Sequence, residues 1–354
     1  MIKILVINPG STSTKIAIFE DNMSLIETTI RHNSDELEEW GNILRQKPKR
    51  MELIKEELVK NNVDFKSINV IVGRCGLVRP IESGTYKINE KMVSDLMSPA
   101  ATEHASALGG LLAYELGKAW NVPSYVVDPI VVDEMDPVAK LSGLAGIERR
   151  SVFHALNTKS VVRKAAEKLG IPYEDGRFIA VHMGGGITVS AHRYGRVIDV
   201  NDAMGGDGTF TPDRSGSLPV LPIIEMCFSR NYTYNQMVEL VQHKGGMYSY
   251  LNINDMLEAE KMIKQGDEFA ALVVDSMAYQ ICKEIGAMFA VLDGRVNAIV
   301  LTGGIAYSTR FTALLKKRVD MLAPVLTFAG ENEMQALAEG VIRVLSGKES
   351  ASIY

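Results

Sequence analysis

A hydroxyl-rich turn near the N-terminus contains the first residues that could carry chemistry. The stretch Gly10–Lys15, GSTSTK, lies between two apolar runs that both favour β-strands. One interpretation is a polar hairpin, because glycine, serine and threonine are common in turns. The other is a phosphate-binding loop, since hydroxyls, a lysine and free backbone N–H groups suit an anion. It is not a Walker loop, because it lacks that loop's second glycine and residues 16–19 favour a strand rather than a helix.

A second glycine turn lies in the other half of the chain. The stretch from Arg177 to Val200, RFIAVHMGGGITVSAHRYGRVIDV, is again an apolar strand, a turn at Gly184–Gly186 and an alternating strand. Nearly half the chain length separates the two turns. This spacing predicts an internal duplication with a cleft between the halves, the alternative being coincidence, since glycine hairpins are common.

Polar residues or glycines follow several predicted strands, where open α/β sheets bind their ligands. Arg74 follows VIVG, Asp128 follows SYVV, Gly303-Gly304 follows NAIVLT, and His182 ends the strand before the second glycine turn. Each has a simpler interpretation when taken alone. Arg74 could be an exposed loop arginine and Asp128 a turn residue. Gly303-Gly304 could form a tight turn without a ligand, and His182 could be a core histidine. Together they favour a ligand site.

A long glycine- and aspartate-rich stretch, DVNDAMGGDGTFTPDRSGSLP, runs from Asp199 to Pro219 and contains Arg214. A solvated loop is the simple interpretation, but a loop of this length inside a compact domain tends to be functional. The arginine fork suits carboxylate or phosphate groups. Two arginines, a histidine, a carboxylate and two glycine turns are the groups that phosphoryl transfer requires.

Strands that alternate with helical segments predict an α/β fold with a mostly parallel or mixed sheet. Helices are expected over residues 100–120, 269–292 and 332–345, the last with Asn332 as its cap. We place the domain boundary near residue 150. This gives domains 1–150 and 151–331, with the helix in 332–354 completing the first domain.

The composition excludes several classes of protein. The 354 residues carry a formal net charge of −5, so a nucleic acid or an anionic membrane surface is not an expected partner. Three widely spaced cysteines fit reduced thiols better than disulfides or a metal site. Without a signal-peptide pattern or a run long enough to span a membrane, we expect a cytoplasmic protein.

Four motifs in order, INPGSTSTK, HMGGG, DRSG and LTGG, resemble the acetokinase family. The resemblance implies two ribonuclease-H-like (actin-like ATPase) domains around a cleft, a homo-oligomer, and reversible phosphoryl transfer from ATP to a short-chain carboxylate with Mg²⁺. HMGGGITVSAHRYGR and DVNDAMGGDGTF are similar to the family branch that uses butyrate, which makes butyrate the expected acceptor. Acetate, propionate or a branched-chain acid is the nearer alternative. A chaperone- or actin-like conformational ATPase is an alternative of another class.

The same resemblance implies roles for individual residues. The catalytic group would comprise Arg74, Arg214, His182 and Asp128. Nucleotide phosphates and adenosine would be bound by Asn8, Ser11, Ser13, Lys15, Gly184, Gly185, Gly186, Gly303 and Gly304. The acid would contact His104, Phe153 and His154, and the carboxylates near magnesium would be Asp128 and Glu333.

Gly76 raises a separate question about the acid. The resemblance implies that acetate kinases carry a branched apolar residue at this position, so a glycine could leave room for a longer acyl chain. Alternatively, the glycine serves the backbone, for example at a positive φ angle. The sequence leaves both interpretations open.

Overall fold

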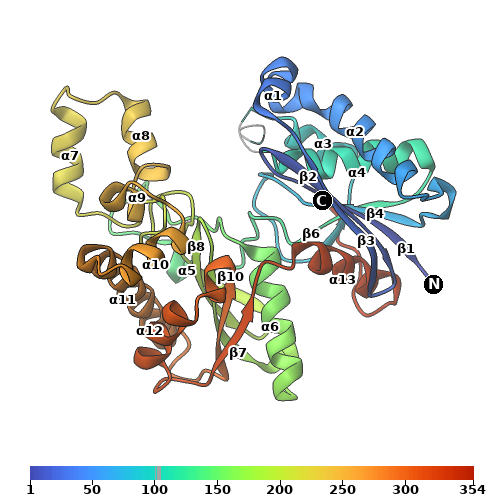
Figure 1. Cartoon of the computed structure of the whole chain (residues 1–354). Helices are drawn as coiled ribbons and strands as arrows, with labels where there is room; N and C mark the ends of the chain where they lie inside the picture. Colours follow the sequence, from blue (N-terminus) through green and yellow to red (C-terminus); the bar gives the residue numbers. More distant parts are fainter. Residues whose placement is uncertain (100, 102–104) are drawn as a thin grey trace. The chain divides into compact units, whose positions relative to one another are not determined.

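The computed structural model describes residues 1–99, 101 and 105–354, and the chain forms two compact units. The first comprises Met1–Val132 together with Asn332–Tyr354, and the second comprises Asp133–Glu331. Figure 1 labels the elements of both. Within the described residues, no helix is both long and apolar enough to cross a membrane.

A six-stranded sheet forms the centre of the first unit, in the order β3-β2-β1-β4-β6-β5. Its strands are β1 (Lys3–Pro9), β2 (Ser13–Glu20), β3 (Met23–Arg31), β4 (Val70–Gly73), β5 (Thr85–Lys87) and β6 (Ser124–Val127). The first three strands are antiparallel neighbours, whereas β1, β4 and β6 run parallel. The parallel strands are almost entirely buried apolar runs, as expected for a sheet covered on both faces.

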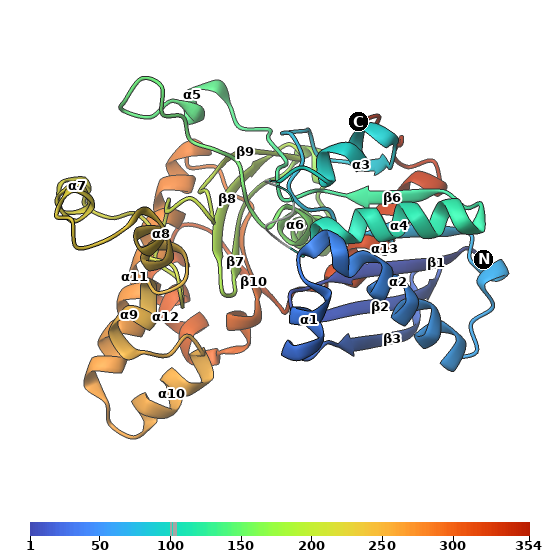
Figure 2. The same ribbon diagram turned by 90° about the horizontal axis from the view of Figure 1, so that it is seen from above.

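Helices cover both faces of this sheet. They are α1 (Ser34–Trp40), α2 (Ile43–Lys60), α3 (Glu90–Leu96), α4 (Ala107–Trp120) and α13 (Glu333–Leu345), with a short 3₁₀ helix at Phe65–Ser67. Helix α4 packs on β1, β4 and β6 beside α2 and α3, and α13 contacts the same three strands (Figure 2). A Cβ atom at Gly73 would lie 2.1 Å from Gly109 O, so this glycine lets α4 approach the end of β4.

The second unit has a five-stranded sheet in the order β11-β10-β7-β8-β9. Its strands are β7 (Arg177–Met183), β8 (Ile187–Arg193), β9 (Arg196–Val200), β10 (Ala298–Gly303) and β11 (Val325–Ala329). Strands β7, β8 and β9 are antiparallel neighbours, and β7, β10 and β11 run parallel. The two sheets therefore repeat one topology, with β5 as an addition to the first, and the predicted α/β fold with internal duplication is confirmed.

Helices also cover the second sheet. They are α5 (Pro137–Lys140), α6 (Ala155–Leu169), α7 (Val220–Phe228), α8 (Tyr234–Gln242), α9 (Gly246–Leu251), α10 (Met256–Lys264), α11 (Glu268–Val291) and α12 (Thr309–Val319), with 3₁₀ turns at Tyr173–Asp175 and Gly304–Tyr307. Ile179, Val181 and Met183 of β7 face the core that contains α11, and Phe178 and Ala180 face α6. By this alternation His182 lies on the α6 face.

Three details differ from the sequence-based expectations. Residues 133–150 lie in the second unit rather than the first, because ion pairs such as Glu134–Lys159 and Arg149–Asp199 bind this segment to it. Helix α4 begins at Ala107, later than residue 100. Asn332 adopts a left-handed conformation (φ 48°) and makes no side-chain cap, so the predicted cap of α13 is wrong.

Candidate functional site

Three predicted side chains meet at the ends of β1, β4 and the start of α13 in the first unit. Asn8 Nδ2 donates to Glu333 Oε2 at 2.7 Å, and Arg74 Nη1 lies 3.0 Å from the same oxygen. Asn8 Oδ1 lies 3.5 Å from Arg74 Nη1. Glu333 and Asn8 are buried, while the Arg74 side chain is 23% exposed. The carboxylate therefore fixes the arginine and leaves part of the guanidinium open to a ligand.

Asp128 follows β6 in a conformation that only glycine adopts freely, with φ at 37°. Its Oδ1 accepts from Ser83 Oγ at 2.6 Å and from Gly84 N at 2.9 Å. No hydrogen bond to another described residue engages its Oδ2. A buried carboxylate held at a strained strand end is typical of functional sites.

The first unit contains carboxylate oxygens of the kind that magnesium binds. The described residues contain no cluster of three or more histidine, cysteine, aspartate or glutamate side chains arranged to hold a metal. Mg²⁺ usually needs only one or two carboxylates, with phosphate oxygens and water as its other ligands. Asp128 Oδ2 and Glu333 Oε1, which no hydrogen bond to a described residue engages, are oxygen donors of this kind.

The hydroxyl-rich turn joins β1 to β2 as a tight hairpin, with Gly10 N donating to Ser13 O at 2.8 Å. The side chains of Ser11 and Lys15 are exposed and that of Ser13 is partly exposed, as a ligand-binding loop requires. Arg50 of α2 lies beneath this turn and hydrogen-bonds to it. We did not predict Arg50 from the sequence; the available signal was a charged residue at a core position of an amphipathic helix.

Two histidines of the second unit stack on each other at the second glycine turn. The rings of His154 and His182 lie 3.8 Å apart with an interplanar angle of 12°. His182 is 1% exposed, and its Nδ1 lies 2.8 Å from Asn157 Oδ1. His154, which precedes α6, is partly exposed, and its Nδ1 lies 2.8 Å from Thr188 Oγ1. His154 is thus the more accessible member of the pair.

Arg214 is brought to the same turn by the long loop between β9 and α7. A Cβ atom at Gly186 would lie 2.6 Å from Arg214 Nη1 and 3.1 Å from His154 Cε1, so only glycine permits this approach. Arg214 Nη1 also donates to Ala203 O at 2.5 Å. The structure therefore places Arg214 and both histidines around Gly184–Gly186.

Ion pairs hold the end of β9 and the start of that loop in place. Arg149 lies 2.8 Å from Asp199, and Arg150 lies 2.8 Å from Asp202. Burial raises the pKa of Asp213, the neighbour of Arg214, above its usual range. These supporting residues were not predicted from the sequence, because their partners are about 50 positions away along the chain.

The predicted adenosine motif follows β10. Gly303 has a φ angle of 87°, and a Cβ atom there would lie 2.3 Å from Met183 O. Gly303 is therefore required where the turn after β10 approaches the end of β7. A Cβ atom at Gly304 would contact nothing within 4 Å, so the backbone at this position is open to a ligand.

Two of the three thiols, those of Cys75 and Cys282, are unreactive at neutral pH. Burial raises the pKa of Cys75, beside Arg74, to about 12, and burial raises the pKa of Cys282 to about 11. Both are protonated at neutral pH, and a protonated thiol is a poor nucleophile.

Two predicted acid-binding residues remain less defined. Phe153, which precedes His154 in the chain, is buried with 2% of its surface exposed. His104 lies outside the described residues.

Gly76 has a packing role that neither sequence-based interpretation included. Its φ angle is not among the positive ones, and a Cβ atom there would lie 2.7 Å from Ala107 N and 2.8 Å from Ala107 Cα. The missing side chain makes room for the start of α4 rather than for an open pocket. The expectation that Gly76 leaves space for a longer acyl chain is therefore wrong.

Gly76→Val is accordingly expected to lower the free energy of unfolding by about 1–3 kcal/mol through overpacking. The ratio of kcat/KM for butyrate to that for acetate should stay unchanged. Urea unfolding and steady-state kinetics measure the two effects. Gly143→Val is the matched control, because its Cβ would contact nothing within 4 Å. A stable Gly76→Val variant with a selective loss of butyrate activity would contradict this account.

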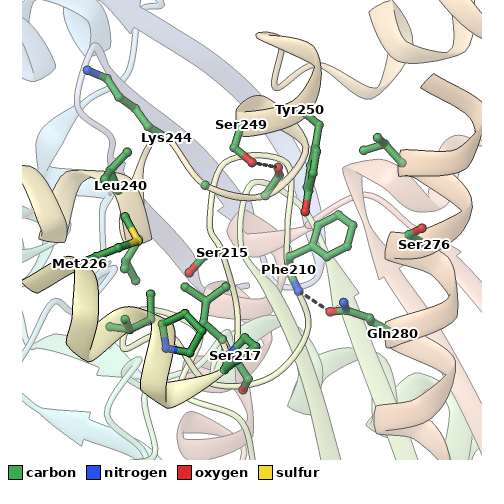
Figure 3. A pocket seen from close by; sticks show the side chains of 18 of the residues that line it. Phe210, Ser215, Ser217, Met226, Leu240, Lys244, Ser249, Tyr250, Ser276 and Gln280 are labelled. Atoms are coloured by element: carbon green, nitrogen blue, oxygen red, sulfur yellow. Dashed lines mark hydrogen bonds between the residues drawn. The ribbon is translucent and has the colours of Figure 1, made fainter. Parts of the chain in front are cut away.

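A separate cavity of about 760 Å³ lies between α7, α8 and α11 (Figure 3). Its lining is largely apolar, and its internal hydrogen bonds join Phe210 N to Gln280 Oε1 and Ser249 Oγ to Gly246 O. None of the predicted site residues lines it. Its apolar lining does not suit a nucleotide phosphate.

Residues 140–351 match the sequence model of the acetokinase family. The structure of Porphyromonas gingivalis acetate kinase is similar with a TM-score of 0.81 and 19% identity, covering 96% of this chain and 99% of that chain. The structure of a propionate kinase from Francisella tularensis subsp. tularensis SCHU S4 is similar with a TM-score of 0.77 and 18% identity, covering 96% of this chain and 99% of that chain. The structure of acetate kinase from Entamoeba histolytica is similar with a TM-score of 0.78 and 17% identity, covering 96% of this chain and 98% of that chain. At these identities the similarity concerns the fold, and the predicted duplicated ribonuclease-H-like fold is confirmed.

Proposed function

Because this chain belongs to the acetokinase family, we propose that it is a carboxylate kinase that transfers the γ-phosphoryl group of ATP to butyrate. In this reaction a carboxylate oxygen forms a bond to the γ-phosphorus while the bond from that phosphorus to the bridging oxygen of ADP breaks. The products are butyryl phosphate and ADP, and the reaction runs in both directions. Acetate, propionate and branched-chain acids are the competing acceptors.

The nucleophile needs no general base, because a carboxylic acid with a pKa near that of a glutamate side chain, about 4.3, is ionised at neutral pH. The barrier is mainly electrostatic, since an anion must approach a polyanion. Arg74 and Arg214 would offset this repulsion, and the histidines would donate to the oxygens of the phosphoryl group in flight. Asp128 then serves to position a cation or its water rather than to remove a proton.

One observation carries the proposal within the second unit: Arg214 and two stacked histidines surround a glycine turn that has no side chains of its own. Donors from three side chains suit a phosphoryl group that carries negative charge on several oxygens. When bound with ATP, Mg²⁺ would supply further neutralisation of that charge, and Asp128 and Glu333 are the residues that would hold it.

The acid preference is tested by ADP release with acetate, propionate, butyrate, valerate and isobutyrate at saturating ATP. We expect the highest kcat/KM for butyrate. An apolar pocket discriminates by about 1–3 kcal/mol per methylene, so the next acids in the series should fall by about 10-fold or more. A maximum at acetate or propionate would make the chain a kinase for that acid. ADP release that is independent of every acid would instead support a conformational ATPase.

The histidine pair yields a prediction of its own. His154→Ala is expected to lower kcat about 100-fold with little change in ATP affinity, because its donor acts mainly in the transition state. His182→Ala should act in the same direction, since it also removes the ring that supports His154. Steady-state kinetics and ATP titration measure both effects. A collapse of ATP affinity with kcat retained would make the altered histidine a ground-state ligand instead.

A further inference from the structure

Arg50 is a fully buried arginine that no part of the proposed mechanism uses. It lies on α2 in line with Gln46, Ile54 and Leu58, all of them buried. Ile54 and Leu58 belong to the apolar core, whereas Arg50 and Gln46 lie in the turns of the helix closer to its N-terminus. A charged side chain without exposure is costly unless it is fully hydrogen-bonded, so its contacts indicate its purpose.

The guanidinium of Arg50 is hydrogen-bonded almost entirely to the hydroxyl-rich turn. Nη1 lies 2.9 Å from Gly10 O, 3.0 Å from Ser13 O and 3.0 Å from Thr14 Oγ1. Nη2 lies 3.1 Å from Ser11 O. The remaining edge is held by Gln46 Oε1, at 3.2 Å from Nε and 2.9 Å from Nη2.

These contacts orient the peptide groups of the turn. Thr12 O accepts from His32 N at 2.9 Å, so every carbonyl from Gly10 to Ser13 is bound to the protein interior. In a planar trans peptide, the N–H group points opposite to the carbonyl. The N–H groups of Ser11 and Thr12 therefore point away from Arg50, which is the arrangement that a phosphate-binding turn needs.

The charge of Arg50 acts in the same direction. Within the described part of the chain, none of its hydrogen-bond partners is a carboxylate. Burial lowers the pKa of Arg50 to about 10, and it remains protonated at neutral pH. Burial and the charge of Arg50 lower the pKa of His32, next to the turn, to about 4. The turn thus rests on a single buried positive charge.

We propose that Arg50 is a positioning residue that turns the carbonyl groups of Gly10 and Ser11 inward and thereby the N–H groups of Ser11 and Thr12 toward the outer phosphates of the nucleotide. This inference rests on the proposed nucleotide-binding function of the turn. It assigns the turn's geometry to a residue about 40 positions away in the sequence. Arg50 itself does not contact the nucleotide.

The test compares Arg50→Lys, which keeps a positive charge but loses the planar fork, with Arg343→Lys as control. Arg343 is a partly buried arginine of the same unit, and its partner is the carboxylate of Glu349. Losing hydrogen bonds to a charged group should weaken ATP binding about 10- to 100-fold. Binding of AMP, which lacks the outer phosphates, and the KM for the acid should stay within about twofold of wild type. Titration calorimetry measures both nucleotides.

An unchanged ATP affinity in folded Arg50→Lys would overturn the proposal. Equal losses of affinity for ATP and AMP would also overturn it, because a residue with only a structural role would affect both nucleotides alike. If Arg50→Lys does not fold, Gln46→Leu tests the proposal by the same comparison of ATP affinity with AMP affinity. This substitution removes the hydrogen bonds to one edge of the Arg50 guanidinium and keeps the volume of the side chain at position 46. If the wild-type protein binds ATP but makes no acyl phosphate, the proposed function fails while the ATP-to-AMP comparison still tests Arg50.

Discussion

Replacing Arg74 by alanine is expected to lower kcat about 100- to 1,000-fold while the protein stays folded, because one preorganised donor to the transition state is lost. Arg74 lies at the end of β4, held by Glu333 Oε2 at 3.0 Å and partly open to solvent. The close approach of Gly73 and Gly109 fixes the backbone at this position. Steady-state kinetics with ATP and butyrate measures the effect.

Arg79→Ala is the control for Arg74. This arginine lies five positions further along the chain in an exposed ion pair with Asp95, and its side chain is 53% exposed. Exposed pairs contribute about 0–1 kcal/mol to stability, so kcat should remain near that of wild type. A folded Arg74→Ala variant with wild-type kcat would remove Arg74 from the mechanism.

The second large effect is expected for Arg214→Ala, again about 100- to 1,000-fold in kcat. The guanidinium lies against Gly186 and near His154, where a phosphoryl group would meet the glycine turn. Arg214→Lys should recover only part of the loss, because an ammonium group cannot reproduce the planar fork. Steady-state kinetics measures kcat, and single-turnover experiments give the rate constant of the chemical step separately from product release.

Arg295→Ala, an exposed arginine of the same unit, serves as the control for Arg214. If Arg214→Ala raised only the KM for ATP and left kcat intact, the guanidinium would bind the ground state and transition state equally. That outcome would contradict the proposed role in charge stabilisation.

The sequence was sufficient for the parts of the fold and site that follow from local patterns. The strand ends at Arg74, Asp128 and Gly303 were predicted correctly, because short apolar runs ended by polar residues or glycine give a strong signal. The repeated strand–turn–strand pattern predicted the duplication. The roles of the site residues remain proposals.

Contacts between distant positions were beyond such patterns. Asn8 and Glu333 are 325 positions apart, and only the family resemblance pointed to Glu333. Arg50 was missed because the pattern of residues along α2 does not show which part of the protein its buried arginine contacts, here the turn between β1 and β2. Gly76 was misinterpreted because the direction of its absent side chain depends on where α4 packs.

The most direct test of the central claim is the stoichiometry of ATP use in the presence of butyrate, Mg²⁺ and hydroxylamine. Hydroxylamine traps an acyl phosphate as its hydroxamate, so the assay counts the proposed product itself. We expect one butyryl hydroxamate for each ADP released, and little ADP without an acid. ADP that forms equally fast without any acid, or that forms without hydroxamate, would contradict the assignment as a carboxylate kinase.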